Sequence, residues 1–74
     1  MTDGLGGMTL GDALPREVAR VRDEVMPAYI EIGPAGTFAL AMMRRDLDEA
    51  ARAMVAGDVV GMLRAYEALK RYET

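Results

Sequence analysis

The chain is organised around one long stretch without helix breakers. No proline or glycine interrupts residues 37–56, whereas Gly33 and Pro34 precede this stretch and Gly57 follows it. Glycine readily adopts the left-handed conformation that ends a helix, and proline is tolerated only in a helix's first turn. The start lies between Pro34 and Thr37, which is a suitable N-cap. The pattern therefore predicts a helix over Thr37–Ala56, roughly 30 Å long.

The two halves of this predicted helix differ in polarity. In the C-terminal half, charged side chains occupy the side of the helix away from the core. Asp46, Asp48 and Glu49 in this half are expected to form a solvated face rather than a cation site. The N-terminal half, residues 38–43, is apolar on every side and needs cover on every side, yet it is shorter than the about 20 apolar residues that span a bilayer. Helical spacing aligns one stripe toward a core: Leu40, Met43, Leu47, Ala50, Ala51 and Met54.

A helix is also predicted before the central one, over Asp12–Ile32, with Asp12 as its N-cap. Pro27 lies inside this helix, opposite its apolar stripe. Because proline removes one backbone hydrogen bond and pushes against Asp23, the sequence predicts a kink, with a break at Met26 as the alternative. The stripe consists of Leu14, Val18, Val21, Val25, Ala28, Tyr29 and Ile32.

The sharpest turn signal is the Gly57-Asp58 pair. Gly57 can close one helix and Asp58 can cap the next. A third helix is therefore predicted over Asp58–Tyr72, antiparallel to the central one, with Gly61 off its apolar face. That face consists of Val59, Met62, Leu63, Tyr66 and Leu69.

Together these patterns predict an all-α fold, either a three-helix bundle or a helical hairpin with a kinked N-terminal helix. Residues 12–74 form the single domain, and residues 1–11, which hold four glycines, form a flexible arm. A chain of 74 residues without cysteine lacks the disulfides and thiolate metal sites that usually stabilise domains of this size. Self-association is the remaining way to stabilise a chain of this size, so a homodimer is expected.

Some apolar residues lie off the predicted core stripes. Met26 and Ile30 form a flank of the first helix, and Phe38 and Met42 lie nearly opposite the stripe of the central helix. A contiguous group of surplus apolar side chains is typical of an interface. These four residues are therefore the candidate interface, and a twofold axis near Phe38 would bring the same patch of two copies together.

The charge pattern argues against nucleic acid as the ligand. The net charge is −3, and nine basic and twelve acidic residues are interspersed, so the surface does not steer toward a phosphate backbone. The alternative function is a nucleic-acid-binding regulator whose dimer gathers basic residues on one face. Those residues are Arg16, Arg20, Arg44 and Arg45.

Catalytic chemistry finds no support in the residue types present. The chain has neither histidine nor cysteine, and no other residues form a catalytic pattern. We therefore expect no enzyme activity, no cofactor and no metal site. The first residues lack the basic start and apolar run of a signal peptide, so a cytoplasmic protein that stays out of the membrane is expected.

The segment GDVVGMLRAYEALK, residues 57–70, resembles the second helix of a tetratricopeptide repeat. The turn and packing positions of that repeat are occupied by Gly57, Asp58, Tyr66 and Leu69. The preceding helix departs from the repeat, because large aromatic residues are replaced by Asp46, Glu49 and Ala53. A period of about 34 residues is also absent, so the resemblance implies a generic helical hairpin.

Residues 32–69, with the runs GPAGTFALAMMRRDLDEA and AGDVVGMLRAYEALK, look like small helical proteins encoded by phages and prophages of proteobacteria. This similarity covers about half the chain and implies a phage-related accessory protein, with no activity or site residues to transfer. The expected function is a self-associating interaction module, regulatory or accessory, that binds another protein.

Overall fold

The computed structural model describes residues 9–73, which are helical except at short connections and contain no strand. The predicted all-α class is therefore confirmed. The predictions for residues 1–8 lie outside the described residues. The elements are α1 (Leu10–Arg20), a π-helical turn η1 (Val21–Val25), α2 (Met26–Ile32), a 3-10 turn η2 (Gly33–Gly36), α3 (Thr37–Ala56) and α4 (Val59–Lys70).

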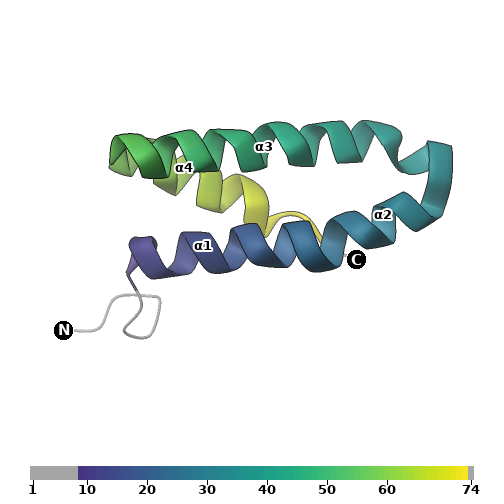
Figure 1. Cartoon of the computed structure of the whole chain (residues 1–74), viewed down its shortest axis with the longest axis horizontal. Helices are drawn as coiled ribbons and strands as arrows, with labels where there is room; N and C mark the ends of the chain where they lie inside the picture. Colours follow the sequence, from purple (N-terminus) through teal and green to yellow (C-terminus); the bar gives the residue numbers. More distant parts are fainter. Residues whose placement is uncertain (1–8, 74) are drawn as a thin grey trace.

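The elements form three rows that run back and forth (Figure 1). α1, η1 and α2 run as one continuous rod, the chain reverses at η2, and α3 runs back beside the rod. α4 lies on the far side of the view and contacts both α1 and α3. The molecule measures 45 × 24 × 15 Å. Because α4 is short, α2 and the first turns of α3 extend past it.

The first helix begins two residues earlier than predicted. The N-cap is Thr9, whose side-chain Oγ1 accepts a hydrogen bond of 3.3 Å from the backbone N–H of Asp12. Thr9 Oγ1 also donates to Asp12 Oδ2 at 3.1 Å. Asp12 therefore stands at the third helical position, where its carboxylate accepts from the hydroxyl of the N-cap Thr9, and the prediction of Asp12 as the N-cap is wrong.

Pro27 is accommodated without a break in the rod. The residues just before it form the π-helical turn, in which the backbone N–H of Met26 donates to the carbonyl of Val21. Such wider turns occur as single insertions within α-helices, and this one lies where the proline ring would press on the preceding turn. Val21 and Val25, the first and last residues of the turn, stay buried, so the break at Met26 does not occur.

The core lies where α1, η1, α3 and α4 meet. Its buried members are Leu14, Val21, Val25, Leu40, Met43, Ala50, Ala65 and Leu69. The predicted stripe of α3 is correct except at Ala51, which is exposed, and Asp46 and Ala53 are buried in its place. The buried face is turned toward these two residues because α3 packs against α4 as well as against the first rod.

The prediction for α4 is wrong at three positions. Val59 and Leu63 are 65% and 51% exposed, although both were assigned to the apolar core face. Gly61, which was placed off that face, instead lies against α3: a Cβ at this position would come within 3.2 Å of the Ala53 Cβ. The close approach of two small residues fixes the rotation of α4, so its core side carries Ala65 and Leu69.

The C-terminal end of α4 is tied to the other helices by polar contacts. Tyr72 Oη donates a 2.5 Å hydrogen bond to Asp46 Oδ2 in α3, and Arg20 Nη2 donates to the carbonyl of Leu69 at 3.1 Å. Tyr29 Oη donates to the carbonyl of Glu73 at 3.3 Å. Asp46 is only 6% exposed, so the prediction of a solvated face is wrong there. The Asp46 carboxylate accepts its hydrogen bond from Tyr72, which is 26 positions away in the sequence.

The contact between Tyr72 and Asp46 predicts an effect at alkaline pH. Burial of the phenol, with the hydrogen bond to Asp46, raises the pKa of Tyr72 to about 12. The phenol of an unfolded chain ionises near pH 10. The unfolded state therefore loses this proton first, and the stabilisation, complete below about pH 10, is lost as the pH rises through about 12.

An absorbance titration of the tyrosine phenolates in the folded protein measures this effect directly. We expect Tyr72→Phe to remove the step at highest pH and to make thermal stability fall less steeply above about pH 10. A high-pH step that persists in Tyr72→Phe would assign it to another tyrosine and contradict the prediction.

Candidate interaction surface

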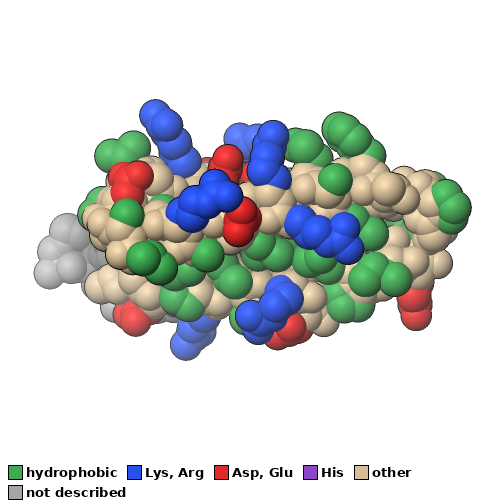
Figure 2. Space-filling view, turned by 45° about the horizontal axis from the view of Figure 1, so that its top comes forward, with side chains coloured by type: hydrophobic (Ala, Val, Ile, Leu, Met, Phe, Trp, Pro, Cys, Tyr) green, Lys and Arg blue, Asp and Glu red, His purple; other side chains and the backbone are tan. Residues whose placement is uncertain are grey.

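One end of the molecule is almost free of charge. This end, here called the tip, comprises α2, η2 and the first turns of α3, residues 26–43, among which Glu31 is the single charged residue. Figure 2 shows hydrophobic side chains along this end and few charged ones, whereas charges of both signs crowd the middle of the same face. Charge depletion with large apolar side chains is the composition of an interface core.

The four residues predicted as an interface all lie in the tip, with different exposure. Phe38 is 78% exposed and Ile30 is 57% exposed. Met26 and Met42 are half-buried, and Met26 packs against the core. Ile32, which was predicted to face the core, is 56% exposed, because α4 ends before the tip and leaves the last turn of α2 without a third helix.

The turn that joins the two helices of the tip is held by close backbone packing. Gly33 adopts a φ of +84°, which only glycine takes without strain. Gly36 is buried directly against α2: a Cβ there would lie 2.4 Å from the carbonyl oxygen of Tyr29. The two helices are therefore fixed relative to each other, and the exposed side chains of the tip are presented on a preformed scaffold.

The four arginines of the alternative function do not all remain available for phosphate. The Arg20 guanidinium is bonded to Glu17 Oε1 at 3.0 Å and to the Leu69 carbonyl, so its role is structural. Arg45 Nη2 lies 3.6 Å from Asp46 Oδ1. Arg16 and Arg44 are exposed. On the face shown in Figure 2, basic side chains alternate with acidic ones rather than forming a basic stripe.

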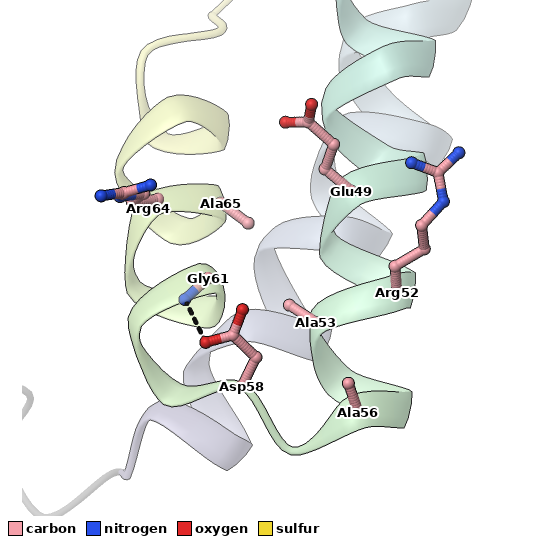
Figure 3. Close-up of a pocket in the computed structure, with 8 residues that line it drawn as sticks. All are labelled: Glu49, Arg52, Ala53, Ala56, Asp58, Gly61, Arg64 and Ala65. Atoms are coloured by element: carbon pink, nitrogen blue, oxygen red, sulfur yellow. Dashed lines mark hydrogen bonds between the residues drawn. The ribbon is translucent and has the colours of Figure 1, made fainter.

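A shallow groove of about 400 Å³ lies between α3 and α4. Its floor is made of small residues, and its charged rim is partly engaged: Asp58 Oδ1 accepts from the backbone N–H of Gly61 at 3.0 Å, and Arg52 Nη2 pairs with Asp48. In Figure 3, Arg64 points away from the groove. The lining residues are Glu49, Arg52, Ala53, Ala56, Asp58, Gly61, Arg64 and Ala65. The groove follows from the close approach of the two helices.

Within residues 9–73, no group of three or more acidic side chains lies close enough to hold a metal ion. In the same part of the chain, every buried side-chain nitrogen or oxygen atom has a hydrogen-bond partner. The described residues thus leave no buried polar group directed at a missing ligand. None of the helices described is both long and apolar enough to cross a membrane.

Comparison with known proteins gives no relative for this chain: no protein family matches it, and no match was found among curated proteins or solved structures.

Proposed function

We propose that the protein is a self-associating protein–protein interaction module, and that two copies meet through the tip. The observation that carries this proposal is the exposure of Phe38, Ile30 and Ile32 on a charge-depleted, preformed pair of helices. A regulatory or accessory role, phage-related as the resemblance of residues 32–69 implies, is part of this proposal and would follow from what the assembled protein then binds.

The apolar side chains of the tip contribute burial energy of the size that an association requires. Burial of one large, fully exposed apolar side chain contributes about 1.5–3 kcal/mol. Phe38, Ile30 and Ile32 from both copies are more than half exposed, so their burial, with that of the exposed parts of Met26 and Met42, is comparable with an association cost of roughly 4–15 kcal/mol. Methionine adapts its shape to an irregular partner surface, and a twofold contact uses the same side chains twice.

Phe38→Asp tests this proposal, because it places a carboxylate in the centre of the contact. We expect light scattering to give a mass above the monomer's 8.0 kDa for the intact chain at micromolar concentration, and 8.0 kDa for Phe38→Asp. Val55→Asp is the matched control: Val55 is 91% exposed on the same helix but outside the tip, and its mass should equal that of the intact chain. Equal masses for Phe38→Asp and Val55→Asp would show that the tip is not the interface.

A further inference from the structure

Residues 69–73, the last two residues of α4 and the three that follow, are hydrogen-bonded to three other helices. The side chains of Arg20, Tyr29 and Asp46, which lie on α1, α2 and α3, each bond to this segment. Within residues 9–73, every other side-chain hydrogen bond joins residues no more than four positions apart. The long-range polar contacts of the described chain therefore converge on one short segment.

This segment reaches the junction between α2 and α3, before which α4 ends. In Figure 1 the chain after α4 turns toward the rod near α2. Tyr72 is half-buried and packs against the core, and its phenol donates to Asp46 in the middle of α3. The Glu73 carbonyl accepts from Tyr29 Oη on α2 at 3.3 Å. Residues 71–73, here called the strap, therefore link α2 to α3.

Few other contacts keep α2 in place. None of its residues is buried, and no side chain caps its start. Pro27, in its first turn, has no backbone N–H to donate, and Gly33, with its positive φ, ends the helix. A segment with few buried apolar side chains opens at a lower free energy than the core does. The position of α2 therefore depends strongly on the strap.

We propose that the strap is a conformational device: it holds the tip closed, and the tip opens as a separate unit when the strap is released. The rest of the core stays packed in the open state. Its members Leu14, Ala50 and Ala65 lie on α1, the second half of α3 and α4, away from the tip.

Control of self-association follows from this device. The exposed side chains of the tip are held in one arrangement only while α2 and α3 are closed on each other, so release of the strap weakens their binding to a partner surface. This consequence rests on the function proposed above, whereas the strap itself does not.

Hydrogen exchange of the α2 backbone amides tests the strap, because a bonded amide exchanges when its helix opens. Tyr72→Ala removes the strap's ring and its bond to Asp46. We expect the α2 amides to exchange about tenfold faster or more in this variant. In the unaltered strap, they should already exchange faster than the amides of residues 47–56 in the second half of α3.

Tyr66→Ala is the matched control, because it removes the same side chain from α4 outside the strap. Tyr66 is half-buried and packs against the core, and its contacts persist while only the tip is open. Its loss should lower the melting temperature yet leave α2 exchange within about twofold. If Tyr72→Ala does not fold, Tyr72→Phe, which removes only the bond to Asp46, is compared with Tyr66→Phe and should exchange several-fold faster in α2.

All these proteins carry Phe38→Asp, so that contact between two tips cannot protect the amides. Equal acceleration of α2 exchange in the Tyr72 and Tyr66 variants would overturn the proposal, because α2 would then open only with the whole domain. No acceleration in the Tyr72 variants would overturn it as well. A mass of 8.0 kDa for the intact chain would remove the proposed self-association and leave the exchange result unaffected.

Discussion

Replacing Met43 with alanine is expected to lower the free energy of unfolding by about 2–5 kcal/mol. Met43 lies two turns into α3 with none of its surface exposed, and it belongs to the core cluster. Truncation removes apolar contacts on all sides and leaves a cavity. A domain of this size has a net stability of about 4–11 kcal/mol, from roughly 0.05–0.15 kcal/mol per residue, so the loss is a large fraction of the total.

Urea denaturation followed by circular dichroism measures this loss. All variants are compared at one protein concentration, because self-association adds to apparent stability. Val55→Ala is the control on the same helix: its side chain is 91% exposed, so a change within about 0.5 kcal/mol is expected. Equal midpoints for Met43→Ala and Val55→Ala would mean that the buried face of α3 is assigned wrongly.

The second large effect is expected at Gly36. A Cβ at this position would lie 2.4 Å from the backbone carbonyl oxygen of Tyr29, closer than real Cβ contacts come, and backbone cannot swing aside as a flexible side chain can. Gly36→Ala must therefore push α2 and α3 apart at the turn. Overpacking of this kind costs about 1–3 kcal/mol, occasionally more. The distortion should also weaken self-association through the tip.

Ala35→Ser in the same 3-10 turn is the matched control, because Ala35 is exposed and a hydroxyl there meets solvent. Thermal melting should separate Gly36→Ala from Ala35→Ser by several degrees, since about 1 kcal/mol shifts the midpoint of a 60–100-residue domain by roughly 4–8 °C. Identical melting curves would show that the two helices are not packed as closely at Gly36 as the structure has them.

Signals that act between sequence neighbours were readable from the sequence. Gly57 does adopt the left-handed conformation, with a φ of +67°, and Asp58 does cap α4 through the N–H of Gly61. Both depend on a few adjacent residues, so no knowledge of tertiary packing was needed. The start of α1 is also a local signal: Thr9 and Asp12 have the spacing of a capping box, which marks Thr9 rather than Asp12 as the N-cap.

Features that depend on distant partners could not be read in this way. The burial of Asp46 requires Tyr72, which only the return of α4 brings near. The apolar residues of α4 cover more than half its circumference, so periodicity alone did not decide which of them face α3. The close approach of Gly61 to Ala53 decides it, and it leaves Val59 and Leu63 outside.

The tip could be predicted from the sequence only in part. Its surplus of apolar residues was evident from sequence, and the exposure of Ile30 and Phe38 agrees with that surplus. The exposure of Ile32 was not foreseen, because the stripe of the first helix includes it in phase. Only the length of α4 relative to the rod shows that this end of the stripe has no third helix. Self-association through the tip remains a prediction.

The most direct test of that prediction is an isotope-filtered nuclear Overhauser experiment on an equimolar mixture of labelled and unlabelled chains. Phe38 is the sole phenylalanine, so its ring resonances are unambiguous. Association through the tip predicts contacts between the Phe38 ring of one copy and the methyl groups of Ile30 or Met42 of the other. Intermolecular contacts that involve other parts of the chain but never the Phe38 ring, or a sample that remains at 8.0 kDa throughout, would contradict it.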